Sequence, residues 1–328
     1  MTTIVAGGAG FVGSHLCDRL IAQGEEVVCL DNLLTGRIGN IAKLLNRSAF
    51  QFVHHDIVEP LAPLPHVDRI YHLASPASPQ AYQRLPIETL RVNSEGTRRL
   101  LEVAARCGAR ILFTSTSEIY GDPLEHPQRE TYRGNVSSTG PRSMYDEAKR
   151  YGEALTTSFS DTYGVTTRIA RVFNTYGPRL DPRDGRIVAN FVVQALRNQP
   201  LTVYGDGTQS RSFQYVDDLI EGLVRLMESD YSGPMNIGNP TEYTVIQFAR
   251  LIQKLTHTDS SIVFETLPGD DPRRRRPDIS LAKAVLGWEP RVPVVVGLER
   301  TIAYFRDELT NDRSARHEAK LMLSQMAS

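Results

Sequence analysis

The fold is decided by a glycine-rich stretch near the N-terminus, Thr2-Thr-Ile-Val-Ala-Gly-Gly-Ala-Gly-Phe-Val-Gly13. Its first five residues have the β-branched, apolar pattern of a buried strand, and a helical pattern begins directly after the glycines. Glycine lets the backbone turn tightly and approach a pyrophosphate, whose charge meets free N–H groups at the helix N-terminus. Taken alone, such a loop is also compatible with an ordinary strand-to-helix turn. Its setting favours a dinucleotide site at Gly7, Gly10 and Gly13.

Short β-branched runs alternate with helical patterns through the first half of the chain. Strands are predicted at residues 2–6, 26–31, 50–54, 69–73, 110–116 and 166–173. Helices are predicted at residues 11–23, 86–107 and 144–163. This alternation is typical of a parallel sheet, and six strands suit a doubly wound fold. The expected fold class is therefore α/β, a doubly wound, Rossmann-like parallel sheet with a smaller C-terminal substrate lobe.

The regular alternation ends after about Asn174, where glycine and proline become frequent. Short strands near residues 201–204 and 235–237 and amphipathic helices follow. We expect a dinucleotide-binding domain over 1–175, a substrate lobe over 176–309 and a polar tail over 310–328. The tail is either a frayed end or a helix that contacts a partner.

Composition excludes several classes of protein. The 328 residues are 41% hydrophobic and 23% charged, as in a soluble globular protein, and 37 Lys and Arg nearly balance 38 Asp and Glu. No overall field therefore attracts nucleic acid or an acidic membrane. Cys17, Cys29 and Cys107 lack metal-ligand spacing, which indicates core residues in a reducing compartment and no metal site. No apolar run approaches the ~20 residues of a membrane span. A cytoplasmic protein that binds neither nucleic acid nor membrane is expected.

A carboxylate ends the second predicted strand. Asp31 follows the glycine loop by about 20 residues, where it can accept hydrogen bonds from the ribose hydroxyls of an adenosine. The same charge repels a 2′-phosphate. Asp31 therefore predicts NAD as the cofactor in preference to NADP.

Tyr145 and Lys149 are four residues apart in a predicted helix, so both side chains share one face. A phenol with its ordinary pKa of about 10 is a poor base at neutral pH. A nearby ammonium and a nicotinamide cation favour the phenolate and bring its pKa toward a useful value. Beside a dinucleotide loop, the pair predicts a base that removes a hydroxyl proton.

Hydroxyl side chains gather at the end of the fifth predicted strand, in Thr114-Ser-Thr-Ser-Glu-Ile-Tyr-Gly121. Open α/β sheets bind ligands at the carboxyl ends of their strands. These hydroxyls can hold a sugar oxygen or simply bond the backbone. Glu118 is more informative, because a carboxylate beside a reacting sugar indicates acid–base work or electrostatic steering.

Together these motifs resemble the extended short-chain dehydrogenase/reductase superfamily, and most closely its UDP-glucuronic acid decarboxylases, also called UDP-xylose synthases. The resemblance covers about residues 3–309. It is carried by His72-Leu-Ala-Ser-Pro-Ala-Ser-Pro79, Ser115-Thr-Ser-Glu-Ile-Tyr-Gly-Asp122, Gly140-Pro-Arg142, Tyr145-Asp-Glu147, Phe173-Asn-Thr-Tyr-Gly-Pro-Arg179, Asp184-Gly-Arg186, Leu201-Thr-Val-Tyr-Gly205, Phe213-Gln-Tyr-Val216 and Asp270-Asp-Pro272.

The residue before Glu118 separates the reactions of this superfamily. Its 4,6-dehydratases have an Asp-Glu pair here, whereas its 4-epimerases lack the acid. Ser117 cannot protonate a leaving hydroxide as a carboxylic acid can, and Glu118 argues against a plain epimerase. The resemblance implies decarboxylation of UDP-glucuronate to UDP-xylose through a 4-keto sugar, with NAD regenerated internally. A nucleotide-sugar 4-epimerase or 4,6-dehydratase is the open alternative. A catalytically silent NAD-binding regulator is disfavoured, since it does not need both Tyr145 and Lys149.

The resemblance implies the catalytic residues Thr116, Ser117, Glu118, Tyr145, Lys149 and Arg275. Tyr145 takes the C4 hydroxyl proton, Lys149 fixes the nicotinamide ribose, and Thr116 helps to hydrogen-bond the developing oxyanion. Glu118 positions the sugar ring and its C6 carboxylate. Arg275 engages that carboxylate and supports reprotonation at C5. The basic run 273–276 leaves this last assignment open by one position and is also compatible with a solvated loop.

The resemblance also implies ligand contacts and an assembly. NAD is expected to contact Gly7, Gly10, Phe11, Val12, Gly13, Asp31, Asn32, Thr35, Gly36, Asp56, Ile57, Leu73, Ala74, Ser75, Tyr145, Lys149, Thr175 and Arg186. The UDP-sugar is expected to contact Asn174, Tyr204, Gln209, Arg211, Tyr215 and Arg275. Arg211 is the candidate for the diphosphate because a guanidinium forks onto phosphate oxygens. Tyr204 and Tyr215 are equally compatible with core aromatics. A homodimer through the helices ending near Cys107 and Tyr163 is implied as well.

Overall fold

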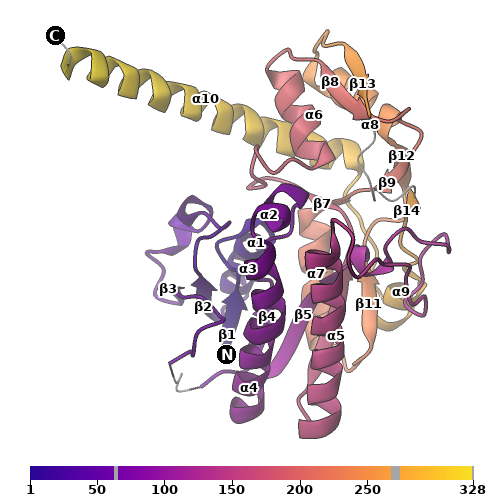
Figure 1. The fold of residues 1–328 in the computed structure, drawn as a ribbon. Helices are drawn as coiled ribbons and strands as arrows, with labels where there is room; N and C mark the ends of the chain where they lie inside the picture. The colour runs from indigo at the N-terminus through magenta and orange to yellow at the C-terminus, as the bar shows by residue number, and fades with distance from the viewer. Residues whose placement is uncertain (63–65, 267–273, 327–328) are drawn as a thin grey trace.

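Seven parallel strands form the central sheet, in the order β11-β6-β5-β4-β1-β2-β3. The computed structural model describes residues 1–62, 66–266 and 274–326, with residues 312–326 described by their backbone alone. The strands are β1 (Thr2–Ala6), β2 (Glu26–Asp31), β3 (Phe50–His54), β4 (Arg69–His72), β5 (Arg110–Thr116), β6 (Thr167–Val172) and β11 (Pro234–Ile237). Figure 1 shows this sheet in the lower part of the molecule. The predicted α/β fold is confirmed.

The sheet has one strand more than the six predicted from the first half of the chain. β11 comes from the second half and pairs with β6, Met235 opposite Ala170. A run of four residues does not reveal which sheet it joins, because strand pairing depends on contacts distant in sequence. The boundaries at 175 and 309 stay a prediction, and the second half of the chain supplies one edge of the large sheet.

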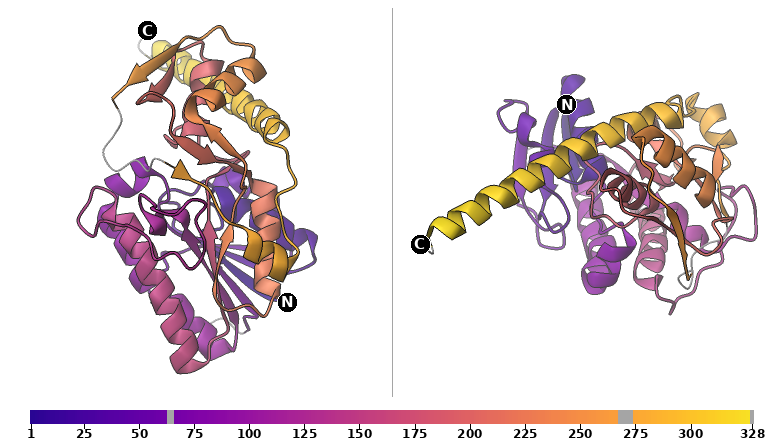
Figure 2. Two further views of the ribbon diagram at one scale, coloured as in Figure 1. Left: turned by 90° about the vertical axis from the view of Figure 1, so that its right-hand side faces the viewer. Right: turned by 90° about the horizontal axis from the view of Figure 1, so that it is seen from above.

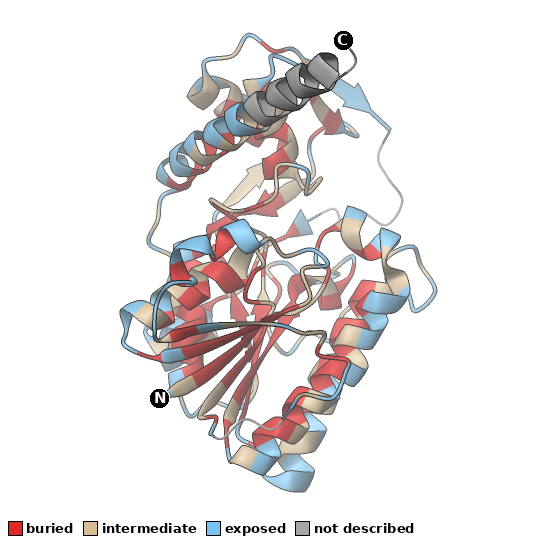
Figure 3. Ribbon diagram, turned by 90° about the vertical axis from the view of Figure 1, so that its left-hand side faces the viewer, coloured by how far each residue is buried: buried red, intermediate tan, exposed pale blue. Residues whose placement is uncertain are grey.

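Helices cover both faces of the sheet, because successive strand residues point to opposite sides. Val5 packs in the core with α1 (Phe11–Ala22) and α7 (Val216–Glu228), whereas its neighbours Ile4 and Ala6 pack with α4 (Thr97–Cys107). α5 (Ser143–Tyr163) lies beside α4 on that second side. The strands are buried between these layers, as Figure 3 shows, which is the usual state of a parallel sheet.

A smaller lobe lies beyond the carboxyl ends of the large sheet (Figure 2). It contains three small sheets, which pair β10 with β7, β9 with β12 and β14, and β8 with β13. The strands are β7 (Thr175–Tyr176), β8 (Leu201–Tyr204), β9 (Ser210–Ser212), β10 (Gln214–Tyr215), β12 (Glu242–Thr244), β13 (Ile262–Glu265) and β14 (Arg274–Arg275). Besides α7, the second half of the described chain contains the helices α6 (Ile187–Leu196), α8 (Val245–Thr256), α9 (Ser280–Leu286) and α10 (Val294–Met326). α10 includes most of the predicted tail.

Shorter elements complete the chain. They are α2 (Pro79–Arg84), α3 (Pro86–Arg91), a π-helical turn (Val92–Gly96) and 3-10 turns at Ile38–Asn40, Ala42–Leu44 and Ser117–Tyr120. The helix predicted over residues 86–107 is thus α3 and α4 joined by the π turn. Within the described ranges, no helix is both long enough and apolar enough to cross a bilayer.

Candidate active site

A cavity of about 640 Å³ opens between the carboxyl ends of the strands and the smaller lobe. It brings together most of the residues predicted for the site. The predicted residues on its wall are Gly7, Gly10, Phe11, Val12, Gly13, Thr35, Leu73, Ser75, Thr116, Ser117, Glu118, Tyr145, Lys149, Asn174, Thr175, Arg186, Tyr204, Gln209, Arg211 and Arg275. The predicted residues that are not part of the described wall are Asp31, Asn32, Gly36, Asp56, Ile57, Ala74 and Tyr215.

The glycine loop forms one end of the cavity, where α1 begins. Gly7 has φ +81°, and a Cβ there would lie 2.7 Å from the backbone nitrogen of Ala74. A Cβ on Gly13 would lie 2.1 Å from the Gly7 carbonyl oxygen, so the helix approaches the loop as closely as glycine allows. Within the described chain, the first turn of α1 has neither a side-chain cap nor an acidic residue. Gly10, Phe11, Val12 and Gly13 line the cavity where the helix begins, and this cradle fits a phosphate group.

Asp31 lies directly behind this loop. Its carboxylate accepts hydrogen bonds from the backbone N–H groups of Ala9 (2.9 Å) and Leu33 (2.8 Å). Gly36 leaves room for that carboxylate, because a Cβ there would lie 2.7 Å from it. Burial raises the pKa of Asp31, while these hydrogen bonds oppose the shift. Asp31 therefore shapes the loop as well as supplying a charge at the end of β2.

Tyr145 and Lys149 project from the first turns of α5 and are 5% and 3% exposed. The Lys149 ammonium donates to the Thr114 carbonyl oxygen at 2.8 Å and lies 5.8 Å from the centre of the Tyr145 ring. The ring of Tyr82 stacks on Tyr145, with centroids 4.9 Å apart and planes 9° apart. Both members of the predicted pair are thus fixed at the cavity wall.

The phenolate predicted for Tyr145 depends on the nicotinamide cation as well as on Lys149, because the surrounding protein favours the neutral phenol. Burial raises the pKa of its phenol, and the Glu118 carboxylate raises it further, while a hydrogen bond with Thr116 opposes the shift. Burial lowers the pKa of the Lys149 ammonium to about 7, so at neutral pH this group carries only part of a charge. Sequence spacing cannot weigh burial against the attraction of a neighbouring ammonium.

Two arginines hold Glu118 at the end of β5. The Arg275 guanidinium forms a two-pronged contact with the carboxylate, Nη2 donating at 2.9 Å to Oε2 and Nη1 to Oε1. Arg142 Nη2 donates to Oε2 as well. Burial alone would raise the pKa of Glu118, but Arg275 and Arg142 lower it to about 2. Glu118 is therefore an anion at any physiological pH, and it fixes both guanidinium groups at the wall.

The basic run 273–276 left open which arginine engages the sugar carboxylate, and the position of Arg275 favours that residue. Arg275 is 4% exposed and lies on the cavity wall, whereas Arg274 beside it is exposed. Gln128 anchors the following residue from both sides, because its backbone N–H donates to the Arg276 carbonyl (2.9 Å) and its Oε1 accepts from the Arg276 N–H (2.8 Å). Arg273 and the Asp270-Asp-Pro272 motif lie outside the described residues.

The residues predicted for the UDP-sugar come from the smaller lobe. Arg211 is 5% exposed and lines the cavity with Gln209 and the half-exposed ring of Tyr204. Tyr215 instead packs in the core against Tyr176, which is the alternative that the sequence left open. Arg186 is ion-paired with Asp184 at 2.5 Å.

Sequence reasoning missed three residues of the site. Tyr82 gave no local signal, since its stacking on Tyr145 depends on a contact between α2 and α5. Its hydroxyl is buried and has no hydrogen-bond partner among the described residues. Arg142 belongs to a motif that the sequence pointed out without a role, and the role of Gln128 follows only from a pairing with residues about 150 positions away.

The fold and this site define a class of protein, and comparison with known proteins agrees. The chain belongs to the NAD dependent epimerase/dehydratase family, whose model matches residues 3–238. Among curated relatives, it is 52% identical over 309 residues to UDP-glucuronic acid decarboxylase 1 of Arabidopsis thaliana, covering 94% of this chain and 71% of the relative. It is 51% identical over 317 residues to UDP-glucuronic acid decarboxylase 1 of Xenopus tropicalis, covering 97% and 75%. The resemblance predicted from the sequence is confirmed.

Solved structures give the same class. UDP-glucose 4-epimerase of Thermotoga maritima, solved with UDP-glucose, is 32% identical with a TM-score of 0.85, covering 94% of this chain and 100% of that one. UDP-glucuronic acid 4-epimerase of Bacillus cereus, in complex with UDP-glucuronic acid and NAD, is 30% identical with a TM-score of 0.81, covering 94% and 99%.

Proposed function

We propose that the chain is an NAD-dependent UDP-glucuronate decarboxylase, which converts UDP-glucuronate to UDP-xylose and CO2 through a 4-keto sugar. One observation carries this proposal: the buried Arg275 guanidinium lies on the cavity wall, held by Glu118 next to the predicted base Tyr145. A guanidinium matches the geometry of a carboxylate, which is the group that distinguishes a uronic acid from a hexose.

The first step is oxidation at C4 of the sugar. NAD, when bound in the glycine cradle, would supply the hydride acceptor for C4 and later the hydride donor, and its positive charge would favour the Tyr145 phenolate. The Tyr145 phenolate takes the C4 hydroxyl proton, and Thr116 orients the phenol through their hydrogen bond. Lys149, held by the Thr114 carbonyl, directs its ammonium toward the same part of the cavity.

The second step is loss of the carboxylate, which is now two carbons from a ketone. The C5–C6 bond breaks, CO2 leaves, and the electron pair becomes an enolate whose oxygen is the former C4 ketone. Thr116 and the protonated Tyr145 stabilise that oxyanion by hydrogen bonds. Arg275 orients the C6 carboxylate and afterwards supports proton delivery to C5. Glu118 stays ionised because of its two arginines, and it positions them.

A 4-epimerase is the competing function, because the chain is structurally similar to UDP-glucose 4-epimerase of Thermotoga maritima and to UDP-glucuronic acid 4-epimerase of Bacillus cereus. Incubation with UDP-glucuronate, followed by proton NMR of the nucleotide sugars, separates the two. We expect UDP-xylose as the product, since the proposed contact with Arg275 holds the C6 carboxylate that decarboxylation removes. UDP-galacturonate as the product would support the epimerase instead.

The cofactor proposal is NAD in preference to NADP. The glycine cradle fits the diphosphate common to both, so the difference lies at the adenosine ribose. Asp31 would repel a 2′-phosphate, and Arg37, an arginine of the cavity wall six residues after Asp31, is ion-paired with Glu308 at 3.0 Å. The remaining predicted NAD and UDP-sugar contacts stay proposals.

Calorimetric titration tests this preference. The unaltered chain should bind NAD at least about tenfold more tightly than NADP, a difference of about 1.4 kcal/mol. In Asp31→Asn the ratio should narrow, because the charge is removed and the shape retained. Glu26→Gln, which removes a charge at the opposite end of β2, is the matched control and should leave the ratio unchanged. Equal affinities in the unaltered chain would mean that Asp31 does not select the cofactor.

The cytoplasmic location and the homodimer also belong to this proposal. Exposed apolar side chains on the packed helices α3 and α5 support a dimer, namely Ile87 (60% exposed), Leu90 (40%) and Tyr151 (51%). Light scattering should give the mass of two chains, and the mass of one chain would contradict the dimer. Fractionation of cells expressing the chain, with recovery in the soluble fraction, tests the location.

A further inference from the structure

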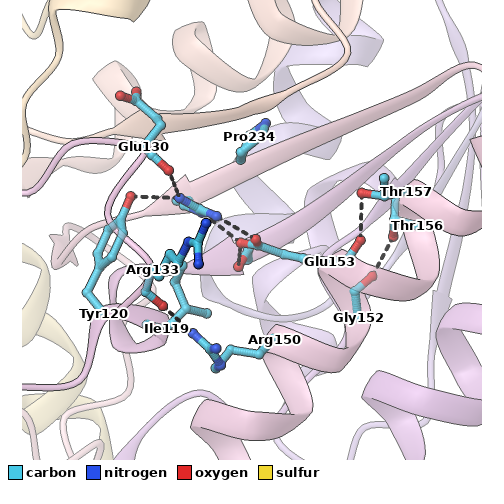
Figure 4. Close-up of polar contacts among 12 residues, drawn as sticks. Ile119, Tyr120, Glu130, Arg133, Arg150, Gly152, Glu153, Thr156, Thr157 and Pro234 are labelled. Atoms are coloured by element: carbon cyan, nitrogen blue, oxygen red, sulfur yellow. Dashed lines mark hydrogen bonds and ion pairs between the residues drawn. The ribbon is translucent and has the colours of Figure 1, made fainter. Parts of the chain in front are cut away.

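A buried polar cluster lies directly behind the catalytic pair and takes no part in the steps above. Its centre is an ion pair between Glu153 of α5 and Arg171 of β6, both largely buried, with side chains 14% and 9% exposed. Arg171 Nε and Nη2 donate to the two Glu153 oxygens at 2.9 and 2.7 Å. The same guanidinium donates to the Tyr120 hydroxyl at 3.0 Å and to the Glu130 carbonyl oxygen at 2.8 Å. Figure 4 shows Glu153, Tyr120 and Glu130 around it.

Glu153 also contacts β5, the strand that ends in the hydroxyl side chains of Thr114, Ser115 and Thr116. The Ser115 hydroxyl donates to Glu153 Oε1 at 2.5 Å, and the adjacent residue, Thr114, receives the Lys149 ammonium at its carbonyl. α5 and β5 are in close contact here, because a Cβ on Gly152 would lie 2.3 Å from the Phe113 ring. Two neighbouring residues of β5 are therefore fixed by two residues of α5, one helical turn apart.

The spacing along α5 places Glu153 on the same side of the helix as the catalytic pair. Tyr145, Lys149 and Glu153 are successive members of an i, i+4 series, so they lie along one face of the helix. Side chains four residues apart on a helix are neighbours, and a glutamate and a lysine so placed attract each other. Glu153 is itself held by Arg171 and Ser115, so its carboxylate cannot turn away to solvent.

We propose that Glu153 is a positioning residue of the reaction, which fixes the end of β5 through Ser115 and whose negative charge favours the ammonium form of the Lys149 side chain over the neutral amine. The ion pair with Arg171 holds the carboxylate in place for both tasks. The proposal deepens the proposed function, on which it rests for the part that Lys149 plays in turnover. The state of the Lys149 amine can be measured without substrate.

Among the described groups around Lys149, Glu153 is the one whose charge stabilises the ammonium. Tyr145, on the same helix, is a neutral phenol, and His72 of β4 is neutral because burial and the Lys149 charge lower its pKa to about 3. The ring of Phe113, from β5, has its centroid 4.9 Å from the ammonium. Arg171 of β6 is compensated by Glu153. Burial lowers the pKa of Lys149, and within the described chain the Glu153 carboxylate is the charge that opposes this effect.

The test is a titration of each lysine amine by NMR of protein labelled with carbon-13 at Cε. The chain has five lysines, Lys43, Lys149, Lys254, Lys283 and Lys320, and the Lys149→Met variant assigns the signal of interest. In Glu153→Gln, which keeps the shape of the side chain, the Lys149 midpoint should fall by about one pH unit, which lowers the ratio of ammonium to neutral amine about tenfold at any given pH. Titrations are recorded on the full chain with and without NAD.

Two further variants separate charge from structure. Glu147→Gln makes the same change on the outer side of α5, where Glu147 pairs with Arg150 at 3.5 Å, and should leave the Lys149 midpoint unchanged. Ser115→Ala removes the hydrogen bond to Glu153 but keeps the charge, so its midpoint should also stay close to that of the unaltered chain. An unchanged midpoint in folded Glu153→Gln, or an equal fall in Ser115→Ala, would overturn the proposal.

The unaltered chain provides a measurement that needs no variant. Lys149 should titrate near pH 7, well below the other lysines. If it titrates with them instead, it needs no counter-charge and the proposal fails. With UDP-glucuronate, the alkaline fall of CO2 release should move to lower pH in Glu153→Gln, so that its deficit is smaller at pH 6 than at pH 8. Absence of CO2 release from the unaltered chain would contradict the proposed function and leave the Lys149 titration interpretable.

Discussion

Replacing Tyr145 by phenylalanine should lower the rate of CO2 release from UDP-glucuronate by about 10² to 10⁴-fold, the usual cost of losing a general base. The substitution removes the phenol oxygen that takes the C4 proton and keeps the ring that stacks on Tyr82. Calorimetry should show NAD binding close to that of the unaltered chain, because the glycine cradle and Lys149 are intact.

Tyr151→Phe is the matched control for this variant. Tyr151 lies on the same helix but is not part of the described cavity wall, and phenylalanine keeps the ring that the proposed dimer would cover. Loss of the Tyr151 hydroxyl should therefore leave the rate of CO2 release unchanged. A Tyr145→Phe rate similar to that of this control would remove Tyr145 from the role of base. Loss of NAD binding together with activity would point to a structural defect.

Replacing Arg275 by alanine should separate oxidation from decarboxylation. CO2 release should fall by at least about a hundredfold, since truncating a charge-paired group in an active site commonly costs several kcal/mol. Tyr145 and Lys149 do not depend on Arg275 for their positions, so C4 should still be oxidised. Reduction of the quenched mixture with borodeuteride, followed by mass spectrometry, should trap a 4-keto sugar that retains its carboxylate.

Arg274→Ala provides the matched control, because Arg274 is the exposed neighbour of Arg275 in β14. It removes the same charge from the same strand and should decarboxylate at the normal rate. The reverse result, with Arg274→Ala inactive and Arg275→Ala active, would transfer the role to Arg274. Normal rates in both variants would mean that the carboxylate is held by another group.

The sequence predicted those parts of the site that depend on neighbouring residues. The glycine loop and the Tyr145–Lys149 pair are local patterns, because the residues of each lie within a few positions of one another along the chain. Arg275 was predicted from family resemblance alone, and the structure adds the observation that its neighbour Arg274 points to solvent. Arg275 lies at the cavity because distant segments pair here, Gln128 with Arg276 and β14 with β9.

The parts that could not be predicted depend on burial or on long-range pairing. The raised pKa of Tyr145 results mainly from its removal from water, which no spacing reports. β11 joins the large sheet from the second half of the chain because its partner β6 forms the edge there. Arg142 and Tyr82 come next to Glu118 and Tyr145 only when α2, α5 and the end of β5 are packed together.

In the proposed reaction, this cavity removes the C6 carboxylate of UDP-glucuronate, and each NAD that is reduced is oxidised again within the same turnover. The most direct measurement uses UDP-glucuronate labelled with carbon-13 at C6, incubated with the full chain and a trace of NAD. We expect one labelled CO2 for each UDP-xylose formed, with no net reduction of NAD. Label that stays in a UDP-sugar, whether in unreacted UDP-glucuronate or in its 4-epimer, would contradict it.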